Sequence, residues 1–223
     1  VQAVVDNVLQ IFEKKITEII VVKRKEHDYH VNTDINTTYI NVSETTGGAA
    51  CSALLAKKYI NNVTPLLIVN SDQLIEVNKI NFKTVFNTVQ DFNDNLIFVF
   101  QIFEKDAKWS FVKLNSSNEV EEVAEKKQIS DLATCGLYYF NSGNLFLECV
   151  EEMMEDNENK INNEFYLAPS YNFIPNEDYV TKVFGIDKMV GIGTPQDYEK
   201  YIRSFQLQYD KHSNILTSIE VNI

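Results

Sequence analysis

Glycine and proline are scarce in this chain, which has seven Gly and four Pro among its 223 residues. Both residue types interrupt helices and strands, so a chain poor in them is expected to lie mostly in regular elements. The length suits one large α/β domain better than two small ones. With 44% hydrophobic residues, such a domain can bury a substantial core.

Positive charge is also in short supply. The formal net charge is −12, from 20 Lys and Arg against 32 Asp and Glu. Proteins that bind nucleic acid need fields of Lys and Arg, so this balance argues against DNA or RNA as a partner. It does not exclude a phosphorylated small molecule that is held by one or two local cations or by a metal ion.

Long apolar runs are missing as well. No run approaches the length of about 20 residues that a membrane-spanning helix needs. The sequence also shows no signal-peptide pattern. We therefore expect a soluble cytoplasmic protein.

Cysteine and histidine are few and dispersed. Cys51, Cys135 and Cys149 are odd in number and widely spaced among apolar or small neighbours. This favours structural thiols in a reducing compartment over a disulfide or a metal site. His27 and His30 lie close together but have no companion ligands at zinc-like spacing, so we interpret them as polar loop residues.

The stretch from Thr64 to Glu76, TPLLIVNSDQLIE, is the centre of the sequence-based interpretation. Its proline marks a turn, and residues 66–69 form an unbroken apolar run that is typical of a buried strand. The run ends in the polar residues Asn70 to Gln73. Ligands of open α/β sheets bind beyond the carboxyl ends of strands, which makes Asp72 a candidate ligand-binding or metal-binding carboxylate. The alternative is that Asp72 caps a turn or the following helix.

The remaining chain alternates between helical and strand patterns. This alternation predicts an α/β fold, with a mostly parallel open sheet, helices on both faces and a small antiparallel ribbon. Thr194 is expected to cap the last helix, and residues 206–223 have no strong period, which fits an edge strand, a tail or a linker. Helices are expected over 1–15, 49–60, 79–90, 145–155, 164–173 and 195–202, and strands over 19–22, 39–42, 66–69, 95–103, 133–140 and 179–186.

Two glycine positions interrupt otherwise regular segments. Gly47 and Gly48 directly precede the helix that starts with AACSALL. Glycine lets the backbone approach a ligand closely, and the helix N-terminus behind the pair favours an anion; the alternative is a loop that needs positive φ. Gly136 lies inside the strand ATCGLYYF, where glycine marks a bulge or a close contact with a ligand.

Residues 109–127, WSFVKLNSSNEVEEVAEKK, account for the ribbon. Two short alternating strands flank the turn NSSN. The segment ends in Glu125, Lys126 and Lys127, and a charged run of this kind is most often a solvated surface.

The order of these pieces resembles the sugar-phosphate nucleotidyltransferase family, the pyrophosphorylases that make nucleotide-sugars such as dTDP-glucose or UDP-glucose. The pieces are a Gly-rich helix start, an apolar strand ending in Asp72, the ribbon ending in EVAEKK, the strand ATCGLYYF and the helix GTPQDYEKY. The resemblance extends nearly to Arg203. It implies a Rossmann-like fold, related to that of GT-A glycosyltransferases, with residues 1–205 as the domain and 206–223 as a tail or linker.

The resemblance also implies roles for particular residues. Asp72 corresponds to the Mg²⁺-binding aspartate, and Lys126 to the lysine that grips the sugar phosphate; we take these two as catalytic. The sugar-phosphate oxygen then attacks the α-phosphorus of a nucleoside triphosphate and pyrophosphate leaves, which requires positioning and charge neutralisation rather than a covalent nucleophile. The implied substrate-binding residues are Gly47 and Gly48 (over the nucleobase), Ser71, Glu125 (to sugar hydroxyls), Gly136 and Glu164 (beside the sugar).

The sequence departs from the family pattern in two places. The family's first strand, its Gly-rich loop ending in Arg and its Lys-Pro pair do not occur in these residues, whose first segment, VQAVVDNV, resembles the helix that follows them. We therefore expect the chain as written to bind triphosphate weakly. At the second place, Gly191 stands where many members have an aspartate as a second metal ligand, and Asp187 is expected to face elsewhere.

Several alternatives stay open. Within the same fold, the acceptor could be a non-sugar phosphate such as phosphocholine. A GT-A-type glycosyltransferase usually carries an Asp-x-Asp pair, whereas Asn70-Ser71-Asp72 has one acid. A non-catalytic nucleotide- or sugar-binding module would fit a chain without the loop. The sequence names neither the base nor the acceptor and leaves a homo-oligomer open. The family resemblance implies nucleotide-sugar supply for capsule, lipopolysaccharide or glycan synthesis.

Overall fold

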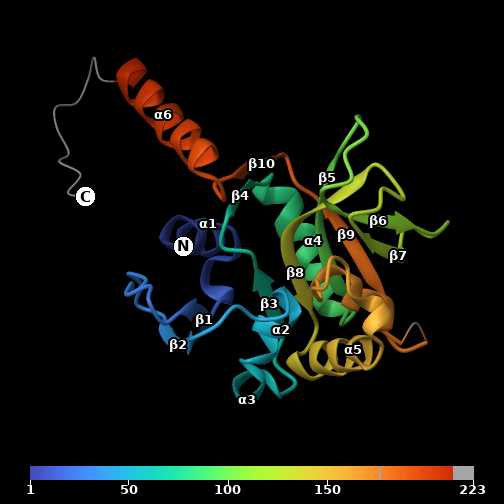
Figure 1. Ribbon diagram of the computed structural model, residues 1–223. Helices are drawn as coiled ribbons and strands as arrows, with labels where there is room; N and C mark the ends of the chain where they lie inside the picture. Colours follow the sequence, from blue (N-terminus) through green and yellow to red (C-terminus); the bar gives the residue numbers. More distant parts are fainter. Residues whose placement is uncertain (176, 213–223) are drawn as a thin grey trace.

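The computed structural model describes residues 1–175 and 177–212 and has an α/β fold (Figure 1). A six-stranded sheet forms its centre, with the strand order β7-β6-β8-β5-β9 and with β3 paired to β8. The six strands are β3 (Leu66–Val69), β5 (Asn95–Gln101), β6 (Ser110–Leu114), β7 (Val120–Glu125), β8 (Leu132–Phe140) and β9 (Thr181–Gly185).

The α/β class, the helices on both faces and the antiparallel ribbon β6–β7 agree with the sequence-based interpretation. The central sheet is mixed, however, because β8 runs antiparallel to β3, β5 and β6, whereas β5 and β9 pair in parallel. The chain leaves β5, forms the ribbon and returns along β8 in the opposite direction. Apolar strand patterns do not encode strand direction, so this reversal was not predicted.

Two small sheets flank the central one. The first joins β1 (Glu18–Arg24) to β2 (Asn36–Val42) in parallel, with Glu18 opposite Asn36. The second joins β4 (Gln73–Glu76) to β10 (Lys188–Gly191) in antiparallel fashion, with Gly191 opposite Gln73. The second pairing brings the late segment around Gly191 next to the turn that holds Asp72.

Side chains alternate between two cores on the two faces of the central sheet. On β8, Leu137 and Tyr139 point into one core, and Tyr138 and Phe140 into the other. This is the alternation of a strand that is covered on both sides. It explains why the run ATCGLYYF is almost uniformly apolar.

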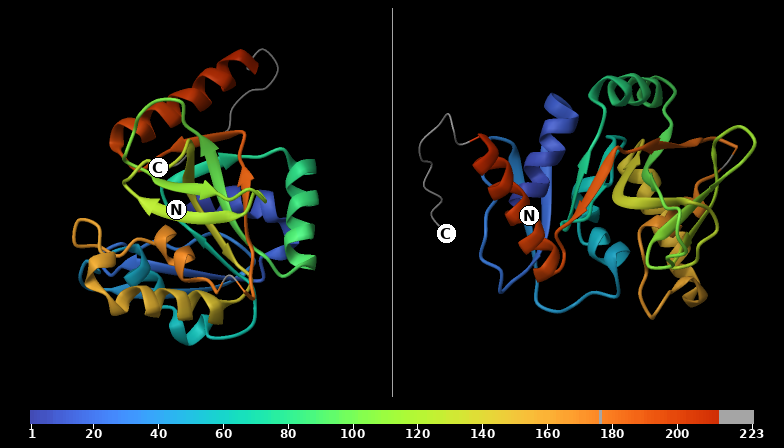
Figure 2. Two further views of the ribbon diagram at one scale, coloured as in Figure 1. Left: turned by 90° about the vertical axis from the view of Figure 1, so that its right-hand side faces the viewer. Right: turned by 90° about the horizontal axis from the view of Figure 1, so that it is seen from above.

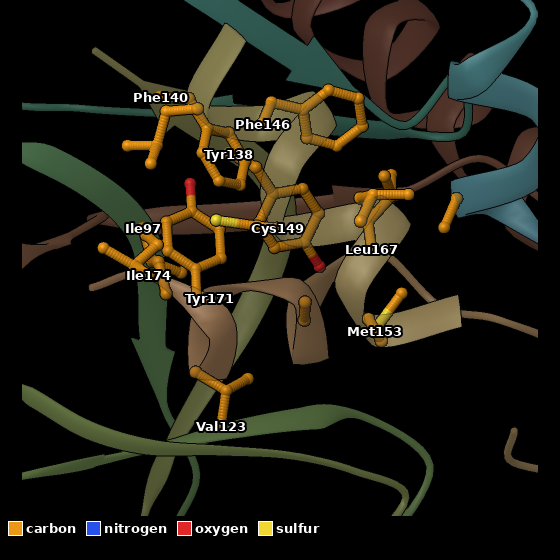
Figure 3. Close-up of a cluster of buried hydrophobic side chains, with 14 of the residues drawn as sticks. Ile97, Val123, Tyr138, Phe140, Phe146, Cys149, Met153, Leu167, Tyr171 and Ile174 are labelled. Carbon is orange, nitrogen blue, oxygen red and sulfur yellow. The ribbon is translucent and has the colours of Figure 1, made fainter. Parts of the chain in front are cut away.

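The first core lies under α1 (Gln2–Phe12) and α4 (Lys79–Asp91). The Phe12 and Phe82 rings meet edge to face, with centroids 5.0 Å apart, and Phe82 stacks on Phe86 at 5.2 Å. The second core lies under α2 (Ala49–Leu54), α3 (Lys57–Ile60), α5 (Gly143–Glu155) and the 3₁₀ helix η3 (Ala168–Phe173). There Tyr171 stacks on Phe140 at 4.4 Å (Figure 3).

The thiols belong to these cores. Cys135 is buried in the first and Cys149 in the second, and burial raises the pKa of each thiol to about 12. Cys51 is half-buried in α2, and all three are free, as expected for structural thiols. His27 and His30 lie in the loop between β1 and β2, also as expected.

Two helical predictions need correction. The helix expected over residues 164–173 starts only at Ala168 and is a 3₁₀ helix, with Pro169 in its first turn. Glu164 instead forms an isolated bridge with Ile161. The helix expected over residues 49–60, after the two glycines, is split into α2 and α3.

The last helix, α6 (Pro195–His212), begins as expected, because Thr194 Oγ1 accepts a hydrogen bond from Asp197 N at 3.1 Å. It continues to His212, past the expected domain boundary at residue 205, so residues 206–212 are helical; residues 213–223 lie outside the described part. Figure 2 shows α6 lying at the end of the molecule away from the ribbon β6–β7. No helix in the described ranges combines the length and hydropathy that a membrane crossing requires.

Candidate active site

A cavity of about 210 Å³ lies where the β3–β4 turn, the ribbon and β8 meet. Three residues singled out from the sequence, Glu125, Lys126 and Gly136, line it together. The structure thus brings a carboxylate, an ammonium and a glycine into one small space. Its other polar lining residues are Asn70, Gln73, Lys108, Trp109, Ser110, Thr134, Tyr138 and Tyr166.

Gly136 forms a part of the cavity wall that has no room for a side chain. Its φ is +77°, and a Cβ there would lie 2.0 Å from Gln73 Oε1 and 2.7 Å from Asn70 Nδ2. Asn70 N also donates to Gly136 O at 2.9 Å. Gln73 Oε1 is buried and has no hydrogen-bond partner within the described residues. An unsatisfied buried acceptor is costly, so a donor from a ligand would be favourable at this place.

Glu125 ends β7 with its side chain inside the protein. The residue is only 8% exposed, and Ser110 Oγ donates a hydrogen bond to its carboxylate. Burial raises the pKa of Glu125, and the negative charge of Glu164 acts in the same direction. The hydrogen bond from Ser110 and the charge of Lys126 oppose that shift. A buried carboxylate in a cavity wall is a strong acceptor for hydroxyl donors.

Lys126 follows immediately and turns inward. Its φ is +53°, and its N–H donates to Trp109 O at 2.9 Å, so the backbone bends at the end of β7. The ammonium donates to the Tyr166 hydroxyl and lies 4.6 Å from the centre of that ring. The hydrogen bond with Tyr166 raises the pKa of Lys126, which therefore stays charged. Lys127 is exposed, so the two lysines have different environments.

Neither Gly47 nor Gly48 lines the cavity, and both contact Phe165 of the same chain. Gly48 has φ +123°, and a Cβ there would lie 2.4 Å from Phe165 O. Phe165 N donates to Gly47 O at 2.8 Å, and Ala50 N donates to Phe165 O at 3.1 Å. The glycines thus allow the backbone of this segment to lie close to the backbone of Phe165. That contact fixes the segment containing Glu164 and Tyr166.

Asp72 lies in the exposed turn between β3 and β4, directly before Gln73. Its carboxylate rests over Gly193, where a Cβ would lie 2.7 Å from Asp72 Oδ2, and Ile192 N donates to Asp72 O at 2.7 Å. Because Gly191 pairs with Gln73, the position expected for a second metal ligand does lie beside Asp72, but it carries no side chain.

The side chains near Asp72 are too few to hold Mg²⁺ by themselves, but they fit an ion that also binds substrate phosphates. Among the residues that the structure describes, no three or more His, Cys, Asp or Glu side chains gather where they could hold a metal ion. Mg²⁺ commonly binds one or two carboxylates together with substrate phosphates and water. Asp72 is suited to be that single carboxylate.

Two other predicted binding residues lie outside the cavity lining. Ser71 is exposed and lines a larger slot between β1 and β3. Glu164 is exposed, and its charge acts on Glu125 and Lys126. Sequence reasoning missed Tyr166 and Gln73; the polar run around Asp72 could have indicated Gln73, whereas no pattern marked Tyr166.

Comparison with known proteins shows what the chain is similar to. A profile of the nucleotidyl transferase family matches residues 2–200. A search of curated proteins finds no significant match. Among solved structures, a nucleoside-diphosphate-sugar pyrophosphorylase from Vibrio cholerae RC9 superposes with a TM-score of 0.70 at 22% identity, covering 89% of this chain and 85% of that one.

Two further solved structures share the fold. A UDP-glucose pyrophosphorylase complexed with UDP-glucose gives a TM-score of 0.71 at 13% identity, over 92% of this chain and 87% of that one. HddC from Yersinia pseudotuberculosis superposes with a TM-score of 0.60 at 18% identity, covering 92% of this chain and 84% of that one. These structural similarities show that the chain has the same fold, and the family profile matches most of its length. The chain therefore belongs to the nucleotidyl transferase family.

Proposed function

We propose that this nucleotidyltransferase transfers a nucleotidyl group from a nucleoside triphosphate to a sugar 1-phosphate, releases pyrophosphate and uses Mg²⁺. The observation that supports this best is the cavity in which the buried carboxylate of Glu125 lies beside the inward ammonium of Lys126. Its products would be nucleotide-sugars for capsule, lipopolysaccharide or glycan synthesis, in the cytoplasm. The structural neighbours described as pyrophosphorylases support the same reaction class.

The cavity is suited to the sugar end of the substrate. Its volume of about 210 Å³ is below the roughly 300–1,000 Å³ of pockets for drug-sized ligands, so it suits one sugar ring better than a whole nucleotide. Glu125 offers acceptors for sugar hydroxyls, and Gln73 Oε1 offers another. Gly136 leaves the wall beside Gln73 and Asn70 free of a side chain.

Lys126 supplies the charge that the phosphate needs. Its ammonium is held by Tyr166 at the cavity wall, in a chain whose net charge is −12. A charge-assisted hydrogen bond to the sugar phosphate both orients the attacking oxygen and reduces its repulsion from the triphosphate. Lys108 also lines the cavity, but its ammonium pairs with Asp106 at 3.1 Å, so Lys126 is the main source of positive charge there.

Asp72 would hold Mg²⁺ together with substrate phosphate oxygens. The ion supplies charge neutralisation for the triphosphate and the leaving pyrophosphate. The chain itself contributes orientation: Glu125 and Gly136 place the sugar, and Lys126 points its phosphate toward the α-phosphorus for in-line attack. No side chain has to form a covalent intermediate.

Calorimetric binding of a small panel of acceptors tests this assignment without nucleoside triphosphate. The panel is glucose 1-phosphate and other sugar 1-phosphates, glucose, inorganic phosphate and phosphocholine. We expect a sugar 1-phosphate to bind at least about tenfold more tightly than either glucose or phosphate, because it uses Glu125 and Lys126 together. Equal binding of inorganic phosphate would contradict the sugar assignment, and preferential binding of phosphocholine would replace it by a non-sugar acceptor.

A further inference from the structure

Four buried polar side chains lie together in the wall of the candidate sugar cavity. They are Ser110 on β6, Glu125 on β7, and Thr134 and Tyr138 on β8. None of the four residues is more than 9% exposed. Burying a polar group costs free energy unless it is hydrogen-bonded, so a group of four beside an apolar core depends on the contacts that its members make.

Hydrogen bonds connect these four side chains. The Thr134 and Tyr138 hydroxyls lie 2.9 Å apart, and Ser110 Oγ donates to Oε2 of Glu125. Burial raises the pKa of Tyr138, whereas hydrogen bonds with Thr134 and with Ser110 lower it. The three hydroxyls and the carboxylate therefore form one chain of hydrogen bonds across three strands, which we call the hydroxyl chain (Thr134, Tyr138, Ser110 and Glu125).

Each hydroxyl has a single proton, which fixes the direction of donation along the hydroxyl chain. An ionised carboxylate can only accept hydrogen bonds. Ser110 donates its proton to Glu125 and must therefore accept from Tyr138, and Tyr138 must in turn accept from Thr134. All three hydroxyls then donate toward Glu125. Hydrogen bonds that are aligned in this way polarise one another, which strengthens the bond to the carboxylate.

Two neighbouring tyrosines have other partners. The Tyr171 ring lies 6.2 Å from the Tyr138 ring, between centroids (Figure 3), but its hydroxyl donates to Tyr139 O at 3.1 Å. The Tyr139 side chain points into the opposite core, where it hydrogen-bonds to Gln90. Tyr138 lines the cavity and Tyr139 does not, so the two adjacent tyrosines of β8 serve different sides of the sheet.

The hydroxyl chain leaves the cavity with acceptors that need donors. Ser110 binds Oε2 of Glu125, which leaves Oε1 as an acceptor for a ligand. Gln73 Oε1 is a buried acceptor without a partner among the residues that the structure describes. A free sugar hydroxyl supplies the donor that such a group needs. A deoxy carbon, an ether or an ester at the same position supplies none.

We propose that Thr134, Tyr138 and Ser110 are positioning residues that hold Glu125 as an ionised acceptor, so that the cavity selects a sugar 1-phosphate with a free hydroxyl facing this carboxylate. The selection rests on the proposed function, whereas the hydroxyl chain itself does not. A sugar that lacks the hydroxyl leaves a buried carboxylate without its partner. A site built in this way rejects such an analogue much more strongly than an apolar pocket rejects an added group.

Carbon-13 NMR titration of the Glu125 carboxyl tests the hydroxyl chain without any substrate; Glu125→Gln identifies the signal. Tyr138→Phe keeps the buried ring and removes the hydroxyl that donates to Ser110. We expect the pKa of Glu125 to rise in this variant, because hydrogen bonds to the ionised form hold it down. Tyr139→Phe is the matched control, the same change at the next position of β8, and should leave the pKa of Glu125 unchanged. An unchanged pKa in Tyr138→Phe would overturn the proposal.

Thr134→Val gives a second measure of the same chain. It removes the hydroxyl furthest from Glu125, so it should raise the pKa of Glu125 by less than Tyr138→Phe does, and it decides the test if the phenylalanine variant does not fold. Lys126 and Glu164 also act on this pKa and are the same in all variants. No rise in Thr134→Val, in a folded protein, would show that the chain ends at Tyr138 and would overturn the role of Thr134.

Calorimetry with glucose 1-phosphate and its four monodeoxy analogues, each lacking one sugar hydroxyl, tests the selection. We expect at least one analogue to bind the original protein at least about tenfold more weakly than glucose 1-phosphate. Tyr138→Phe should reduce that ratio at least about threefold, and Tyr139→Phe should preserve it. Equal binding of all five ligands would overturn the selection. If neither these ligands nor any other sugar 1-phosphate binds, the proposed function fails instead, and the NMR titration still decides whether the hydroxyl chain holds Glu125.

Discussion

Lys126 Nζ donates a hydrogen bond to the Tyr166 hydroxyl and lies 4.6 Å from the centre of the Tyr166 ring. This contact joins the end of the ribbon to the segment before η3. Phe165, the neighbour of Tyr166, is in turn bound to the backbone of Gly47 and Ala50. The position of the Lys126 ammonium thus depends on three segments that are distant in sequence.

Tyr166→Phe tests whether this contact positions Lys126. The ring remains, so its cation–π contact remains, but the hydroxyl acceptor is lost. We expect the affinity for sugar 1-phosphate to fall about three- to tenfold, and the melting temperature to change little. Calorimetry with glucose 1-phosphate measures this, with Tyr198→Phe as the control at an exposed site. Identical affinities in the two variants would show that the hydroxyl does not position the lysine.

Glu125→Gln tests the electrostatics of the cavity. Because burial makes the pKa of Glu125 higher in the folded chain than in the unfolded chain, the folded chain binds the proton more tightly. Stability is therefore lost as pH rises from the ordinary glutamate pKa through the raised one. The glutamine variant should be more stable than the original at neutral pH and gain nothing at pH 4. Thermal unfolding at both values measures the difference; a glutamine variant less stable at neutral pH would contradict the account.

Gly136→Ala tests the cavity wall. The positive φ strains any other residue by about 1–3 kcal/mol, and the added methyl also displaces Gln73 Oε1 and Asn70 Nδ2. We expect a clearly lower melting temperature and weaker sugar-phosphate binding. Gly185→Ala is the matched control, because a Cβ there meets nothing within 4 Å. Equal stability of the two variants would show that the wall tolerates a side chain.

Asp72→Asn tests the metal site. Asp72 is exposed, so the variant should keep its melting temperature. If Asp72 binds Mg²⁺, pyrophosphate release should fall at least about tenfold and need more Mg²⁺ for half-maximal rate. Asp187→Asn is the control. The backbone N–H of Asp187 donates a hydrogen bond to Glu76 O at the end of β4, away from the Asp72 turn. Unchanged Mg²⁺ dependence in the Asp72 variant would remove the metal assignment.

The sequence predicted the individual strands and helices more reliably than the direction and pairing of the strands. The apolar runs at 66–69 and 95–103 predicted strands, and the structure has strands there: β5 is buried along most of its length, whereas β3 is half-buried throughout. The direction of β8 was not, because antiparallel and parallel strands in such a core have the same composition. The slot between β1 and β3 exists because these two strands do not pair with each other. Strand pairing is a long-range property that a local sequence pattern does not predict.

The candidate site was predictable in part. Glu125 and Lys126 were singled out by resemblance, and the structure places them in one cavity with Gly136. The contact between Gly48 and Phe165 was not predicted, because the two residues are far apart in sequence. Tyr166 was missed because a tyrosine in an irregular segment has no periodicity that would mark it.

The most direct test of the central claim compares Lys126→Ala with Lys127→Ala in binding of sugar 1-phosphate by calorimetry. Lys126 is half-buried against Tyr166, and its neighbour is exposed. We expect Lys126→Ala to weaken binding by about 10- to 100-fold without a comparable loss of thermal stability, and Lys127→Ala to change it by less than about twofold. If the two variants bind alike, the charged run is only a surface, and the sugar-phosphate site lies elsewhere.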